Sequence, residues 1–113
     1  MGKYAEIITL LSSSTKTASS ETDHKDLGSF NEGVACINLT ALSGTEPTLD
    51  LTLQFSPDLE NWFDDPDTVF YQMYGTGKQV VRFSNFGKYV RLKYVLGGTD
   101  PSFTFSIDLL MKD

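Results

Sequence analysis

The chain has 113 residues, enough for one domain whose hydrophobic core is stable without disulfide bonds. Fifteen acidic residues against nine Lys and Arg give a formal net charge of −6, which disfavours nucleic acid as a partner, because affinity for phosphates depends on cationic side chains. A single cysteine, Cys36, and a single histidine, His24, exclude an intrachain disulfide and a Cys/His zinc site.

The N-terminal third predicts one strand and a loop. Residues 5–12 are rich in Ile and Leu at alternating positions, which is typical of a β-strand. Residues 16–20 are small and polar and predict a weaker extended segment, whereas residues 21–33 mix charges with glycines and predict a mobile loop. Residues 1–33 are therefore expected to contain an extended arm and a mobile loop, with an ordinary first strand and loop as the alternative.

The middle of the chain predicts two strands separated by a turn at residues 44–47. Residues 34–42 place one apolar row on a single face, and residues 49–56 alternate most clearly between apolar and polar side chains. The inward positions of these strands are Ala35, Ile37, Leu39 and Ala41, then Leu49, Leu51, Leu53 and Phe55.

Residues 57–67 contain two prolines and five acids, and we expect them to leave the sheet. The aromatic-rich residues 68–74 predict the next strand, and residues 78–84 predict another after a glycine turn. Residues 85–87 are short enough for a tight hairpin.

Two final strands are predicted over residues 88–96 and 103–111, with a turn-rich connector between them. Their inward positions include Val90, Leu92, Tyr94, Phe103, Phe105, Ile107, Leu109 and Met111. The whole pattern predicts an all-β protein, a single antiparallel β-sandwich over residues 1–113 that is jelly-roll-like and has about seven or eight strands. No run approaches the roughly 20 apolar residues of a membrane span, so no membrane association is expected.

No catalytic constellation is found in the sequence. His24 lies in a polar loop between acidic and basic residues, and the sequence does not pair it with a nucleophile. No serine sits in a Gly-x-Ser-x-Gly elbow. Residues 58–67 hold enough carboxylates to suggest calcium, but their spacing does not match a calcium-binding loop, and a solvated acidic loop is the simpler interpretation. We therefore predict no enzyme, no cofactor and no metal.

Two sets of side chains are candidates for binding. Trp62 and Phe63, next to polar residues, are a possible stacking platform for a sugar ring, although a tryptophan here also fits a lid over one end of the core. Alternation points Tyr89, Arg91 and Lys93 outward, where they are available to dock a partner.

Two resemblances bear on function. Residues 54–62 (QFSPDLENW) with residues 87–92 (GKYVRL) resemble, more weakly, the strand and loop pattern of discoidin-type β-sandwich modules. The span from about Leu49 to Lys112, especially residues 86–91 (FGKYVR) and 98–106 (GTDPSFTFS), is similar to small all-β virion structural proteins of tailed bacteriophages.

The second resemblance implies a non-enzymatic role in a phage particle. Such proteins act as capsid decoration (cement) proteins that bind the major capsid protein and stabilise the assembled head shell, or as tail-associated modules. It further implies a homo-oligomer, with a trimer as one candidate, made in the host cytoplasm and located on the capsid surface of the virion. The alternative is a tail-associated or carbohydrate-binding module.

Overall fold

The fold is all-β. A computed structural model describes residues 4–28, 30, 32–84 and 88–112, and none of these residues is helical. None of them therefore lies in a helix that could cross a membrane. The described residues form seven strands: β1 (Tyr4–Lys16), β2 (Ser20–Glu21), β3 (Lys25–Asp26), β4 (Glu32–Ser56), β5 (Phe63–Val69), β6 (Gly77–Ser84) and β7 (Tyr89–Lys112). Their pairings are antiparallel, which confirms the predicted fold class.

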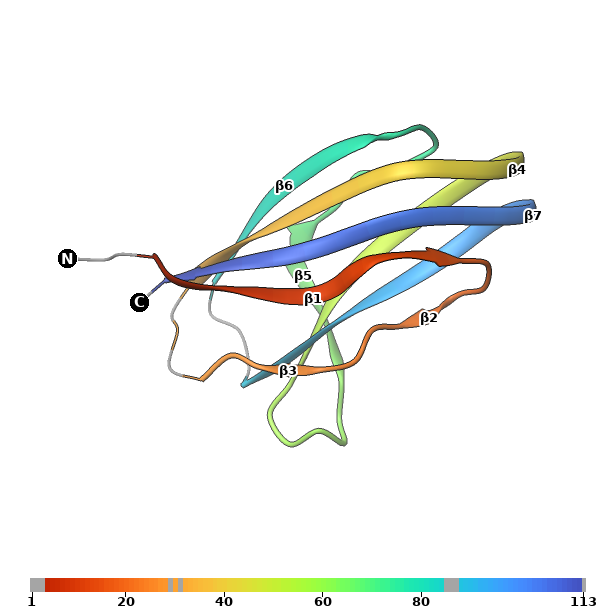
Figure 1. Cartoon of the computed structure of the whole chain (residues 1–113). Coiled ribbons are helices and arrows are strands. Elements are labelled where there is room, and N and C mark those ends of the chain that lie inside the picture. Colours follow the sequence, from red (N-terminus) through yellow and green to blue (C-terminus); the bar gives the residue numbers. More distant parts are fainter. Residues whose placement is uncertain (1–3, 29, 31, 85–87, 113) are drawn as a thin grey trace.

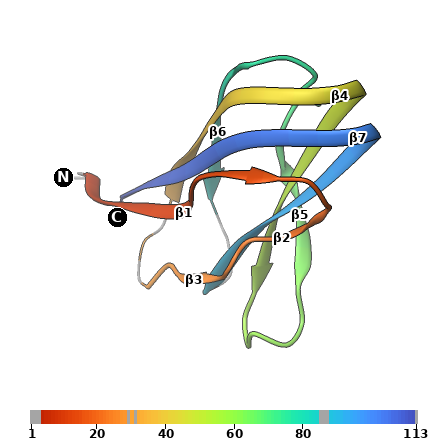
Figure 2. The ribbon, with the colours of Figure 1, turned by 45° about the vertical axis from the view of Figure 1, so that its right-hand side comes forward.

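Two long strands bend together and build both layers of the sandwich. β4 and β7 pair from Glu32 with Lys112 to Ser56 with Tyr89, and Figures 1 and 2 show both strands running to one end of the molecule, bending and returning. The first layer contains β1, the second half of β7, the first half of β4 and β6. The second layer contains β2 and β3, the first half of β7, the second half of β4 and β5.

The bend is made where the pairing of β4 and β7 changes register. Register shifts lie between Ser43 and Thr48 of β4, and strands that pass from one sheet to another commonly do so through such bulges. Gly44 (φ 116°) and Gly98 (φ 98°) both have positive φ values there. The prediction of separate strands joined by turns at residues 44–47 and 97–102 was therefore wrong, because each turn is a bend within one strand.

The core lies between the two layers and contains the residues that alternation predicted. Leu49, Leu53, Phe103 and Phe105 have no exposed surface, and the other predicted inward residues of β7 are also buried. Ala41 is the exception: it is exposed, because a register shift between Leu39 and Ala41 moves it off the inner face.

The edge of the second layer differs from the prediction. Residues 63–67 were expected outside the sheet, but they belong to β5, which pairs with β4 on one side. An edge strand tolerates Pro66 and several acids because one of its sides needs no hydrogen-bond partner. Of the strand predicted at residues 68–74, only Thr68 and Val69 lie in a strand, followed by a single bridge from Met73 to Leu49.

The predicted hairpin at residues 85–87 lies outside the described residues. On either side of it, β6 pairs with β4 in the first layer, whereas β7 begins in the second layer. Within the described residues, β6 and β7 do not pair with each other.

The N-terminal third follows β7 along both of its halves. β1 pairs with the second half of β7, starting at Tyr4 opposite Lys112, so the described chain begins and ends at the same end of the fold (Figure 1). β2 and β3 then return along the first half of β7. Backbone hydrogen bonds from Thr22 to Leu92 and from Leu27 to Lys88, both 2.8 Å, hold this returning segment.

Candidate functional site

A polar network crosses the outer face of the second layer. Register places Arg91 of β7 beside Gln54 of β4, and Gln54 beside Asp64 of β5. On the other side of β7, Glu21 of β2 lies opposite Lys93. We call the following residues the Arg91 network: Glu21, Gln54, Trp62, Asp64, Arg91 and Lys93.

Gln54 is the centre of the Arg91 network. Its Oε1 accepts a hydrogen bond from Arg91 Nε at 2.8 Å, and its Nε2 donates one to Asp64 Oδ1 at 2.7 Å. The residue is only 7% exposed, so both ends of its amide are satisfied by protein groups as burial requires. This amide fixes the positions of the cation and the carboxylate on either side of it.

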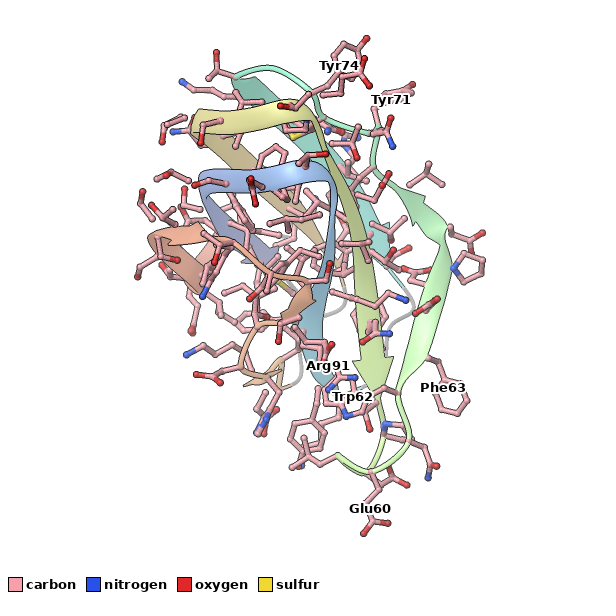
Figure 3. The ribbon with its side chains drawn as sticks, turned by 90° about the vertical axis from the view of Figure 1, so that its right-hand side faces the viewer. Glu60, Trp62, Phe63, Tyr71, Tyr74 and Arg91 are labelled. Carbon is pink, nitrogen blue, oxygen red and sulfur yellow. The ribbon has the colours of Figure 1, made fainter. Side chains whose placement is uncertain are left out.

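Trp62 packs against the charged end of Arg91. The guanidinium carbon of Arg91 lies 4.2 Å from the centre of the Trp62 ring, a cation–π contact, and Figure 3 shows the two side chains together near the end of β4. Arg91 also approaches Glu21, at 3.9 Å between Nη1 and Oε1. Trp62 is half-buried at the surface, and one face of its ring is already covered by the guanidinium.

Phe63 does not share a surface with Trp62. Its side chain is 60% exposed, and Figure 3 shows it on the other side of β5, pointing away from the Trp62 ring. The two residues predicted to form one platform are thus placed apart, since neighbouring residues at the start of a strand project to opposite sides.

The three residues predicted to dock a partner share the outer face of β7, and each already has contacts within the chain. Arg91 makes the cation–π contact with Trp62, and Lys93 Nζ lies 3.6 Å from Asp64 Oδ2. The ring of Tyr89 lies 6.0 Å from that of His24 in an edge-to-face arrangement. The structure therefore places the three side chains in line along the outer face of β7, and Lys93 is more accessible than Arg91.

The pKa of Asp64 is lowered, first by the hydrogen bond from Gln54 and then by the charge of Lys93. Because the Lys93 and Asp64 side chains are 35% and 57% exposed, their ion pair contributes at most about 1 kcal/mol.

The acidic segment uses its carboxylates to order its own backbone. Asp58 Oδ1 accepts hydrogen bonds from the backbone N–H groups of Glu60 and Asn61, both at 2.9 Å, and Oδ2 accepts one from Asn61 Nδ2. Asp65 accepts from the backbone of Asp67 and from the Thr68 hydroxyl. Within the described residues, no group of three or more His, Cys, Asp or Glu side chains is arranged to hold a metal ion.

These hydrogen bonds lower the pKa of Asp58 to about 2, with the backbone N–H of Asn61 as the largest cause. Since this pKa is depressed in the folded state, the stabilisation from Asp58 is present above its ordinary pKa of 3.8 and is lost as the pH falls towards 2. We expect an NMR titration of the Asp58 carboxyl carbon to give a midpoint near 2. In Asn61→Ala the midpoint should rise, because the hydrogen bond from Asn61 Nδ2 is lost while the backbone N–H remains. An unshifted midpoint in the wild type would contradict this account.

Sequence reasoning missed Gln54 and Glu21 as members of the network. Alternation assigns Gln54 to the polar, outward face of its strand, which is where it lies, but that pattern does not reveal that neighbours bury it. The missing information is the register between β4, β5 and β7, which a single sequence does not contain.

A cavity of about 440 Å³ lies where β5 and β6 pass the start of β4. Its lining carries both signs of charge, including Arg82, Asp67 and the ion pair of Lys112 Nζ with Glu32 Oε1 at 2.9 Å. None of the residues predicted for docking or stacking lines it.

The fold and this surface define a small antiparallel β-sandwich whose second layer carries a cross-strand polar network. No family model matches the chain, and no curated protein matches its sequence. Among solved structures, eight chains are similar, including the SPBc2 prophage-derived protein YomS. That similarity has a TM-score of 0.57 and 14% identity, and it covers 100% of this chain and 96% of the YomS chain. At this identity the two proteins share a fold.

Proposed function

We propose that this protein is a non-enzymatic structural component of a bacteriophage particle, and more specifically a capsid decoration protein. In this role it binds the major capsid protein on the outside of the assembled head shell and stabilises the shell. It acts as a homo-oligomer, with a trimer as one candidate, clustered at symmetry positions of the shell.

The observation that carries the proposal is the extent of the similarity to YomS. The match spans essentially the whole of this chain and of the solved YomS chain, and YomS is prophage-derived. The resemblance of residues 49–112 to virion structural proteins of tailed phages points to the same class of protein. A protein that acts by binding a shell requires an ordered surface and no catalytic group, and hydrogen bonds, ion pairs and a cation–π contact hold the side chains of the Arg91 network in place.

The test is binding to purified, matured phage head shells. We expect the protein to co-sediment with the shells at saturable stoichiometry and to raise the temperature or chaotrope concentration at which the shells open. Absence of binding to every maturation state of the shell would overturn the proposal.

Lys93 is the best probe of which face docks, because its ion pair is exposed and its loss costs little stability. If the outer face of the second layer contacts the shell, Lys93→Ala should weaken binding by about tenfold, which is about 1.4 kcal/mol. Lys78→Ala is the matched control, since Lys78 is exposed on β6 in the other layer. Equal binding of both variants would exclude the Lys93 face as the docking surface.

The exposed ring of Phe63 favours a second candidate, a carbohydrate-binding module of a phage tail. Trp62 is the only tryptophan, so its fluorescence reports on this region alone. A host polysaccharide stacked on the Phe63 ring should bind saturably in isothermal titration calorimetry, and Phe63→Ala should abolish that binding, whereas a change in Trp62 fluorescence would place the ligand on the Trp62 side of β5. No response to any host polysaccharide would exclude this candidate.

A further inference from the structure

The outer face of the first layer carries apolar side chains on four neighbouring strands. Register places Ile7 of β1 beside Leu110 of β7, and Leu110 beside Val34 of β4. Two residues further along β4, Cys36 lies beside Val80 of β6. We call Ile7, Val34, Cys36, Val80 and Leu110 the apolar strip.

The apolar strip faces solvent and lies opposite the core side of its strands. Ile7 and Val80 are each 67% exposed, and the other three residues are half-buried. The pKa of the Cys36 thiol is raised, mainly by partial burial and secondly by the negative charge of Asp108. The burial effect agrees with apolar surroundings. The outer face of the second layer is different, because there the outward positions are occupied by the Arg91 network.

Two charges of opposite sign border the apolar strip. Arg82 of β6 lies beside Val34, and Asp108 of β7 lies beside Cys36. Neither side chain makes a hydrogen bond or an ion pair with another described residue, in contrast to Arg91 and Asp64 on the opposite face. The cation is at the β6 edge and the anion is towards β1, so the charges on this face are separated.

We propose that two copies of this chain pack these faces together around a two-fold axis that runs parallel to the strands. Such an axis places β6 of one copy over β1 of the other, and β7 of one copy over β4 of the other. Leu110 then faces Val34 of the second copy. Arg82 lies one strand across and two residues along the strands from Asp108 of the second copy. The apolar strip is covered, and each bordering charge gains a partner.

The area available predicts a weak dimer. Four strands about 4.8 Å apart, over about eight residues of roughly 3.3 Å each, give a face of roughly 500 Å² per copy. The total, on the order of 1,000 Å², is at the lower limit for a specific interface. We therefore expect a dissociation constant on the order of 10–100 µM. This self-association does not depend on binding to a capsid.

Val80→Asp tests the contact, because it places a second carboxylate near Asp108 of the other copy, and Val69→Asp is its matched control. Both are valines on edge strands, and they are 67% and 65% exposed, but Val69 lies on β5 in the other layer. Analytical ultracentrifugation of the wild type should show a monomer–dimer equilibrium. Val80→Asp should raise the dissociation constant at least tenfold, whereas Val69→Asp should leave it unchanged; circular dichroism verifies that both variants fold.

Charge reversal tests the two-fold arrangement without altering the apolar strip. Arg82→Asp and Asp108→Arg should each weaken the dimer, and the double variant should restore it, because the reversed charges again face each other. Cys36 is the only cysteine, so its reaction with a thiol reagent should slow as the dimer forms. The proposal would be overturned if the wild type stays monomeric or forms a trimer. It would also be overturned if the double variant dimerises no more tightly than the single variants.

Discussion

Replacing Phe105 with alanine should lower the free energy of unfolding by about 3–5 kcal/mol. Phe105 has no exposed surface and lies in the first layer on the second half of β7. Its ring meets that of Tyr94, on the first half of the same strand, edge to face at 5.7 Å. The cavity left by alanine would lie between layers that a continuous strand holds apart, so it would collapse little. Chemical denaturation monitored by circular dichroism measures the loss.

Phe63→Ala is the matched control for this prediction. The same atoms are removed, but from a side chain that is 60% exposed, so the change should stay within about 0.5 kcal/mol. A loss below about 1 kcal/mol for Phe105→Ala would mean that the layers do relax into the space.

Gly98→Ala should be comparably damaging, with a loss of about 3 kcal/mol or more. Gly98 has φ 98°, and a Cβ there would lie 2.6 Å from the carbonyl oxygen of Glu46 and 2.7 Å from that of Thr45. Those oxygens belong to the backbone of β4 at the bend, so the contact cannot be relieved by turning a side chain. The result should be a lower midpoint in thermal and denaturant unfolding.

Gly75→Ala separates this effect from a general sensitivity to losing glycine. No atom lies within 4 Å of a Cβ built at Gly75, and its φ is not positive. We expect a change within about 0.5 kcal/mol, or a small stabilisation from the less flexible unfolded chain. Equal losses at the two glycines would argue against the bend as the cause.

The core was predictable because alternation is a local property. Residues 49–55 and 103–111 reveal their inner faces from side-chain chemistry alone, and Leu53 and Phe105 are buried as predicted. Arg91 and Lys93 were likewise assigned to the outer face by their positions between Val90, Leu92 and Tyr94, all of which are buried.

What escaped prediction depends on contacts between distant parts of the chain. The glycines and prolines near residues 44–47 and 97–101 suggested turns, whereas the pairing of β4 with β7 carries both strands through the bend together. Pro66 suggested a loop because the sequence does not identify β5 as an edge strand. Gln54 became a network residue only when register placed Arg91 and Asp64 on either side of it.

The pairing of Tyr4 with Lys112 determines how the fold responds to a mechanical load applied at these two residues. Because β1 begins opposite the end of β7, a load applied between Tyr4 and Lys112 pulls perpendicular to the two strands. The hydrogen bonds between β1 and β7 then break one pair at a time instead of sharing the load along the strands. The fold should therefore open at low force when it is held at Tyr4 and Lys112, and it should withstand more force when one of the two attachment points is moved to the bend of β4 and β7.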